Sequence, residues 1–157
     1  MFSDSSNKIF PMRIELELTN ACNSSCTYCP RKFMNYEIGF MDISLFHRLI
    51  DEIVTYPGRT LVLFRRGESL LHPEFAKMLN YAKGKFKEIQ LATNASLMDR
   101  ALARLIADSV TFVSFSLELP ERYQRYRKLD YATVLKNVDY LLSINKKSKT
   151  QISIVKT

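Results

Sequence analysis

Apolar and polar residues alternate along the chain with two periods, one of two residues and one close to 3.6 residues. Short segments with the period of two predict β-strands, and longer amphipathic segments predict helices. The expected strands cover 12–18, 61–64, 88–92, 110–117 and 151–155. The expected helices cover 42–54, 97–107 and 131–144, and one more helix is expected to begin at Pro73. Ser96 is expected to cap the helix at 97–107.

Strands and helices follow one another in regular alternation, which predicts an α/β fold with parallel strands. One face of these strands is apolar, and helices should cover it. The other face carries polar residues, namely Glu15, Glu17, Gln90, Asn94, Ser114, Ser116, Glu118, Gln151 and Ser153. A packed core does not tolerate so many unpaired polar groups. We expect them to line a wet cavity, with Glu17, Asn94 and Ser116 nearest the loop after the first strand, although an open sheet that meets solvent is the alternative.

That loop carries the most informative residues of the chain, its only cysteines, Cys22, Cys26 and Cys29. An odd number of cysteines cannot all form disulfides within one chain. Thiolates spaced C-x3-C-x2-C can bind three irons of a [4Fe–4S] cluster and leave the fourth iron open. A zinc site is the alternative, but it normally needs a fourth Cys or His. The two histidines, His47 and His72, are both distant in the sequence.

Composition narrows the remaining possibilities. A chain of 157 residues is long enough for one domain with a real core. It has no apolar run of membrane-spanning length and no signal-peptide core in MFSDSSNKIF, so we expect a cytoplasmic protein with no membrane partner. The formal net charge is +7, but many lysines fall where helices should end and complement the helix dipole. Nucleic-acid binding is therefore not expected.

The segment C-N-S-S-C-T-Y-C resembles the signature of the radical S-adenosylmethionine (radical SAM) superfamily, in which an aromatic residue such as Tyr28 usually precedes the last cysteine. The resemblance implies that the three cysteines bind a [4Fe–4S] cluster whose open iron binds S-adenosyl-L-methionine. It implies an oxidoreductase that cleaves this cofactor reductively to a 5′-deoxyadenosyl radical, which abstracts hydrogen from a substrate. Tyr28 would then lie near the adenine.

A second motif, Arg66-Gly67-Glu68-Ser69, stands where the family usually reads Gly-Gly-Glu-Pro. The resemblance implies that Gly67, Glu68 and Ser69 bind the methionyl end of the cofactor, with Glu68 on its ammonium group. Arg66 is expected either to crowd that ammonium or to pair with Glu68. An ordinary strand-to-helix loop is the alternative.

Two shorter matches follow in the family's order. Thr93-Asn94 stands for Thr-Asn-Gly, with Ala95 in place of the glycine, and Ser116 begins Ser-Leu-Glu in place of Ser-Leu-Asp. The resemblance therefore adds Asn94 and Ser116 to the expected cofactor contacts.

The other candidate residues have plainer interpretations. The next basic and aromatic segment contains Arg122, Tyr123, Arg125, Tyr126 and Arg127. We interpret it as a solvated helical turn, with contact to an anionic or aromatic substrate as the alternative. His72 is interpreted as a capping or packing residue and His47 as structural, and no catalytic residue is assigned.

The resemblance also implies a parallel (β/α) partial TIM-type barrel, truncated here to about five strands of six. Residues 1–11 would be an N-terminal extension, and 12–157 a core domain that is incomplete at its C-terminus. The resemblance is to the N-terminal part of the core domain in the SPASM/twitch-like subgroup, whose members carry cysteine-rich C-terminal extensions. Members of that subgroup act on peptides, proteins, sugars or cyclitols and receive electrons from donors such as flavodoxin or ferredoxin. A cluster-containing binding or regulatory module without radical catalysis is the alternative function. The exposed fifth strand predicts self-association.

Overall fold

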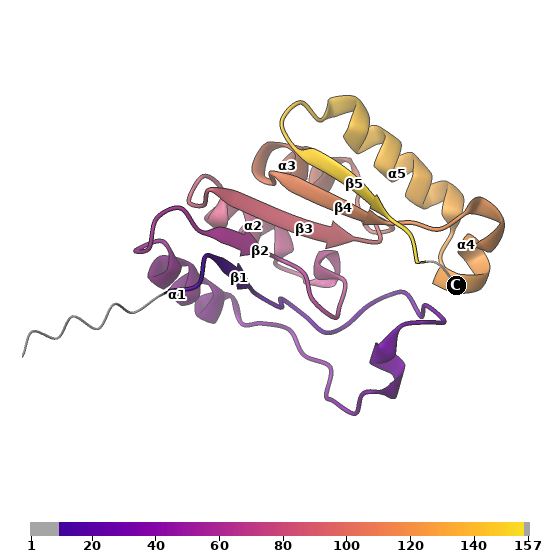
Figure 1. The fold of residues 1–157 in the computed structure, drawn as a ribbon, viewed down its shortest axis with the longest axis horizontal. Coiled ribbons are helices and arrows are strands. Elements are labelled where there is room, and N and C mark those ends of the chain that lie inside the picture. The colour runs from indigo at the N-terminus through magenta and orange to yellow at the C-terminus, as the bar shows by residue number, and fades with distance from the viewer. Residues whose placement is uncertain (1–9, 156–157) are drawn as a thin grey trace, which may run out of the picture.

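Five parallel strands form one sheet in the computed structural model, which describes residues 10–155 (Figure 1). The strands are β1 (Arg13–Glu15), β2 (Thr60–Val62), β3 (Glu88–Thr93), β4 (Phe112–Ser116) and β5 (Lys149–Ser153). Their spatial order is the same as their order in the chain, and every adjacent pair is parallel. The α/β fold with a parallel sheet is therefore confirmed, although β1 and β4 are shorter than predicted and β5 begins two residues earlier.

Helices lie between successive strands and pack on one face of the sheet (Figure 1). They are α1 (Ile43–Ile53), α2 (Phe75–Ala82), α3 (Arg100–Ser109), α4 (Pro120–Arg127) and α5 (Tyr131–Ile144), with short 3-10 helices η1 (Pro30–Phe33) and η2 (Ser69–Leu71). Contacts between α1 and α2, α2 and α3, and α3 and α5 make a continuous helical layer. No helix among residues 10–155 has both the length and the apolar character needed to cross a membrane.

Two predicted helix starts are wrong, and each has a local cause. The α3 helix begins at Arg100 because the Asp99 carboxylate, not Ser96, caps it by accepting a hydrogen bond from Leu102 N at 2.8 Å. The α2 helix begins at Phe75 rather than Pro73. The backbone N–H of Glu74 donates to His72 Nδ1 at 3.1 Å, which holds the preceding residues in a turn.

The core lies between the sheet and the helical layer, as the alternation predicted. Along β3, Ile89, Leu91 and Thr93 are buried, whereas the residues between them are half-buried. On the opposite face, strand register places Glu15, Val62 and Gln90 side by side. The polar face therefore does point away from the helices.

Candidate functional site

A hollow of about 170 Å³ opens at the carboxyl ends of the strands. Its wall contains seven of the predicted site residues, namely Cys22, Cys26, Cys29, Gly67, Glu68, Asn94 and Ser116. Their loops follow different strands, and parallel strands bring those loops to one edge of the sheet. The predicted cavity on the polar face therefore exists at this edge. Nearer the amino ends the same face is open, with the side chains of Arg13 and Glu15 exposed by 46% and 37%.

The cysteine loop is held from two sides. On one side, Glu68 N donates a hydrogen bond to Ala21 O at 2.8 Å. On the other, Ser24 Oγ donates to Arg127 O at 2.5 Å, and Thr27 N donates to Tyr126 O at 2.9 Å. The loop is thus fixed between the segment after β2 and the α4 helix.

All three cysteines are free thiols and half-buried. Burial raises the pKa of the Cys22 thiol, while the Ser24 N–H and the positive charge of Arg31 act in the opposite direction. Among residues 10–155, no three Cys, His, Asp or Glu side chains are grouped closely enough to hold a metal ion. Thiolates that share one zinc ion must approach to within about 4 Å, because each Zn–S bond is about 2.3 Å. A cube binds each thiolate at a different iron, and three soft thiolates on one wall of the hollow are the ligands that such a cluster takes.

Neither histidine supplies a fourth zinc ligand. His72 is buried, its Nε2 donates to Met41 O at 2.9 Å and its Nδ1 accepts from Glu74 N. His47 stacks on the Tyr81 ring with centroids 3.9 Å apart. Both histidines are therefore packing residues, as predicted.

Gly67 permits a close approach between two backbone segments. A Cβ atom at this position would lie 2.2 Å from Thr19 O and 2.5 Å from Ala21 O, which is sterically impossible without backbone movement. The resemblance implied that Gly67 contacts the methionyl end of the cofactor. The close contact observed is with the chain that leads into the cysteine loop, so Gly67 fixes the two halves of the hollow against each other.

The Glu68 carboxylate joins two segments beside the hollow, its own loop after β2 and the end of β3. One oxygen accepts from the Thr93 hydroxyl at 2.7 Å and from Leu70 N at 3.2 Å, and the other accepts from Asn94 N at 2.8 Å. The side chain is only 3% exposed, and this burial raises its pKa despite the three donors. The carboxylate organises the loops after β2 and β3 and also faces the hollow.

The predicted pairing of Arg66 with Glu68 is wrong, because Arg66 pairs instead with Glu17, which follows β1. Arg66 Nε donates to Glu17 Oε1 at 2.9 Å, and Arg66 N donates to the same oxygen at 3.0 Å. These hydrogen bonds lower the pKa of the Glu17 carboxyl. Arg66 lines the hollow while it is paired with Glu17, and among residues 10–155 Glu68 forms no ion pair.

Asn94 stands beside the cysteine loop. Its Nδ2 donates to Asn23 Oδ1 at 2.9 Å and lies 4.0 Å from Cys22 Sγ. The next residue, Ala95, is fully buried with φ of 58°, in the left-handed region that favours glycine. The residue preference at this position of the motif therefore has a conformational cause.

Ser69 and Tyr28 do not line the hollow. The Ser69 hydroxyl donates to Leu63 O at 2.5 Å, which ties η2 to the end of β2. Tyr28 packs against Tyr126, with ring centroids 6.4 Å apart. Its hydroxyl is buried without a partner among the described residues, and burial raises the pKa of Tyr28 to about 12.

Arg127 is a site residue that the sequence analysis missed. The prediction of a solvated turn is right for the exposed Arg122 and Arg125 but wrong for Arg127, which is 7% exposed and lines the hollow. Its Nη2 donates to Leu117 O at 3.0 Å, and its Nη1 lies 4.0 Å from Cys26 Sγ. Its Nε is buried without a partner among the described residues, which suits a polar ligand in the hollow. The spacing of buried Tyr123 and Arg127, four residues apart on α4, was the available signal.

The family model of the Radical SAM superfamily matches residues 16–157. Over 106 residues the chain is 31% identical to the tungsten-containing aldehyde ferredoxin oxidoreductase cofactor-modifying protein of Pyrococcus furiosus. This match covers 66% of this chain and 30% of that protein. It is 26% identical over 160 residues to a GTP 3′,8-cyclase of Staphylococcus carnosus, covering 93% of this chain and 47% of that enzyme.

The fold agrees with these matches. The crystal structure of Streptococcus suis SuiB bound to S-adenosylmethionine superposes with a TM-score of 0.77 and 17% identity, covering 94% of this chain and 35% of that one. The chain thus spans less than half the length of each relative named here. The family uses a [4Fe–4S] cluster and S-adenosyl-L-methionine, which agrees with the three thiols on one wall of a polar hollow. With its family model matched over residues 16–157, this chain belongs to the radical SAM superfamily.

Proposed function

We propose that this chain carries the cluster and the cofactor site of a radical SAM enzyme. Cys22, Cys26 and Cys29 bind the [4Fe–4S] cluster, and the hollow beside them holds S-adenosyl-L-methionine. The observation that carries the proposal is that the three thiols share one wall with Gly67 and Glu68. Held by these residues, the cluster would supply one electron for reductive cleavage of the cofactor's sulfonium, with release of methionine, and the cofactor would supply the group that takes hydrogen from the substrate.

The charges of the hollow complement the amino-acid end of the cofactor. Glu68 offers a carboxylate for the ammonium group, and Arg127 offers a guanidinium with a free Nε for the carboxylate group. Asn94 and Ser116 lie on the same wall and are assigned to the remaining polar groups of the cofactor. Tyr28 is assigned to the adenine end, and Ser69 acts through the backbone that positions Glu68.

The substrate is assigned only by class. SuiB has been solved in complex with the precursor peptide SuiA, and it superposes with a TM-score of 0.76. A peptide or protein is therefore favoured over a sugar or cyclitol. The donor of electrons is a low-potential carrier such as flavodoxin or ferredoxin, and the oxygen-sensitive cluster suits the cytoplasm.

The test is anaerobic reconstitution followed by iron and sulfide analysis and by detection of 5′-deoxyadenosine. We expect the chain to bind one cluster and, with dithionite and cofactor, to form 5′-deoxyadenosine. Cys26→Ala should lose most of the iron, whereas Ser25→Ala, an exposed change in the same loop, should retain it. Unchanged iron and sulfide in Cys26→Ala would refute the cluster assignment. A loaded cluster that binds the cofactor without cleaving it would favour a binding or regulatory module instead.

A further inference from the structure

The cysteine loop has a second accessible side, away from the cofactor hollow. A smaller hollow of about 80 Å³ is lined by Ser24, Ser25, Cys26, Cys29, Arg31 and Lys32. Cys26 and Cys29 therefore border both hollows, and the loop is the partition between them. A cluster on these thiols would approach the protein surface on this second side.

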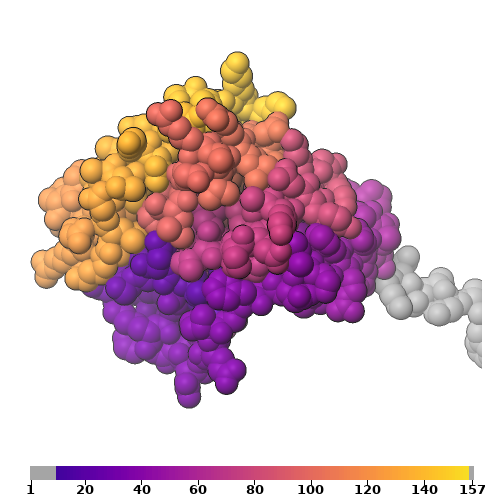
Figure 2. Space-filling model, turned by 180° about the vertical axis from the view of Figure 1, so that it is seen from behind, coloured from indigo at the N-terminus to yellow at the C-terminus, as the bar shows by residue number. Residues whose placement is uncertain are grey.

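This second side is basic and partly apolar. Arg31 and Lys32 follow the last cysteine in η1, Phe33 is 83% exposed, and no Asp or Glu occurs from residue 24 to residue 36. Within the part of the chain that the structure describes, neither Arg31 nor Lys32 forms an ion pair. The purple segment that contains η1 stands out from the body in both views (Figures 1 and 2). We call Arg31, Lys32, Phe33 and the smaller hollow the outer face.

The neighbouring helix adds positive charge. The α4 helix contacts the cysteine loop through the hydrogen bond from Thr27 N to Tyr126 O. It and its C-cap carry exposed Arg122, Arg125 and Lys128 against a single acidic residue, Glu121. Unpaired cations beside an exposed aromatic ring, as Arg31 and Lys32 are beside Phe33, are typical of a surface that attracts an acidic protein and also makes an apolar contact.

We propose that the outer face docks an acidic one-electron carrier protein of the flavodoxin kind. The inference rests on the proposed function, because it needs a cluster on the three cysteines. Electron transfer weakens steeply with distance, so a carrier must dock where the thiolates come closest to the surface, and the cofactor occupies the other side. In the transfer the carrier's flavin hydroquinone loses one electron and the cluster gains one, with no covalent bond formed or broken in this chain.

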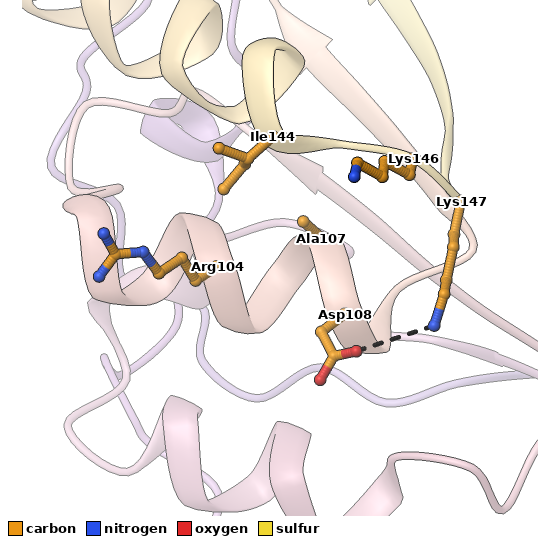
Figure 3. A pocket seen from close by; sticks show the side chains of 6 residues that line it. All are labelled: Arg104, Ala107, Asp108, Ile144, Lys146 and Lys147. Carbon is orange, nitrogen blue, oxygen red and sulfur yellow. Dashed lines mark ion pairs between the residues drawn. The ribbon is translucent and has the colours of Figure 1, made fainter.

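A second basic region of the molecule supplies a matched control. A hollow of about 330 Å³ between α3 and α5 is bordered by Arg104, Asp108, Lys146 and Lys147 (Figure 3). Lys147 Nζ lies 4.0 Å from an Asp108 oxygen. Lys146 and Lys147 precede β5, so they lie at the amino ends of the strands, opposite the cysteine loop. Their charges cannot bring a carrier near the thiolates.

The experiment compares two double charge reversals that change the net charge equally. They are Arg31→Glu with Lys32→Glu, and Lys146→Glu with Lys147→Glu. Each protein is reconstituted anaerobically, and the loss of visible cluster absorbance is followed after mixing with rising concentrations of flavodoxin hydroquinone. We expect the outer-face variant to be reduced about tenfold more slowly per flavodoxin at low salt. Reduction by dithionite should be unchanged, and the Lys146/Lys147 variant should behave as the wild type.

The salt dependence of the reduction rate and a single substitution, Phe33→Ser, test the same docking proposal further. Rising ionic strength should slow the wild type towards the outer-face variant, because screening removes the attraction. Phe33→Ser should slow reduction by flavodoxin but not by dithionite. Equal slowing in both double variants would overturn the proposal, since net charge alone would then explain it.

Two other results in the outer-face variant would also overturn the docking proposal: slower reduction by dithionite, or loss of iron. If Arg31→Gln with Lys32→Gln gave the same result, the two residues would support the cluster itself rather than a docked carrier. A wild type that binds no iron would instead refute the proposed function, and iron analysis separates that failure from a docking failure.

Discussion

The Glu68 carboxylate accepts a hydrogen bond of 2.7 Å from the Thr93 hydroxyl, across 25 residues of sequence. This bond joins the loop after β2 to the end of β3, and the Asn94 N–H strengthens the junction at 2.8 Å. A carboxylate that is 3% exposed would normally be expelled to solvent, and here three donors retain it. Glu68 is therefore both a structural link and the negative group of the hollow.

The raised pKa of Glu68 predicts a pH effect on the stability of the metal-free protein. Its pKa lies above the ordinary value of 4.5, so the native state binds the proton more tightly than the unfolded state. The stabilising contribution is complete below pH 4.5 and is lost as the pH rises through the folded-state pKa. In urea unfolding, the free energy of unfolding of the wild type should fall relative to that of Glu68→Gln as the pH rises above 4.5 and through the folded-state pKa. Glu52→Gln, an exposed change on α1, serves as the control, and parallel curves for wild type and Glu68→Gln would contradict the prediction.

The same substitution should weaken binding of S-adenosyl-L-methionine to the loaded cluster. Glu68→Gln removes the negative charge offered to the ammonium group, and a charge-assisted hydrogen bond contributes about 1.5–3 kcal/mol, or roughly 10- to 150-fold in affinity. The variant should keep its iron and sulfide. Calorimetric titration of the cofactor measures the change, and an unaltered Kd would remove Glu68 from the cofactor site.

Gly67→Ala should destabilise the protein, whereas Gly39→Ala should not. The new methyl group at position 67 would lie 2.2 Å from Thr19 O, and at position 39 it would meet nothing within 4 Å. Forced backbone movement at a packed site costs about 1–3 kcal/mol or more. Urea unfolding measures the loss, and iron content after reconstitution should fall in parallel. Equal stability of the two variants would show that residues 19–21 yield easily.

Arg127→Met should shift the reduction potential of the cluster to a more negative value, by roughly tens of millivolts. The guanidinium places a positive charge 4.0 Å from Cys26 Sγ, and such a charge favours the reduced, more negative cluster. Arg125→Met, an exposed change on the same helix, should leave the potential where it is. Redox titration followed by electron paramagnetic resonance gives both values. A potential in Arg127→Met that matches the wild type would show that the charge is screened.

We expect the protein to self-associate through the unpaired edge of strand β5. Among the described residues β5 pairs only with β4. Ile152 in this strand and Ile154 just after it are exposed by 56% and 53%. An unpaired edge with apolar side chains recruits another strand. Light scattering should therefore show assemblies that grow with protein concentration, and Ile152→Lys should reduce them. A wild type that stays monomeric at all concentrations would contradict this.

Local patterns predicted the elements well because each helix and strand has a clear period of its own. The cysteine loop, the loop at Gly67 and the polar face were all found from residues close together in sequence. The missed features depend on competition between neighbours or on long-range contacts. Asp99 outcompetes Ser96 as a cap because its carboxylate reaches Leu102 N, whereas the Ser96 hydroxyl bonds Asn94 Oδ1.

The predictions for Arg66 and Arg127 failed because both residues make long-range contacts. Arg66 pairs with Glu17, 49 residues away, and no local pattern marks that partner. Arg127 is buried where the cysteine loop, 101 residues earlier in the sequence, and Leu117 O meet the end of α4. A single sequence does not show that Arg66 meets Glu17 or that Arg127 meets the cysteine loop, and only the folded sheet reveals these neighbours.

The sequential order of the strands has a consequence for the protein during translation. Cys26 leaves the ribosome 101 residues ahead of Arg127, a delay of roughly 5–20 s at ordinary rates of synthesis. Glu68 and Asn94 emerge in between, so the wall around the thiols is assembled one βα unit at a time. A cluster inserted into the nascent chain would lack the α4 contacts that hold the loop. Cluster loading therefore belongs after synthesis of the fourth unit, and until then the cell must keep three exposed thiols reduced.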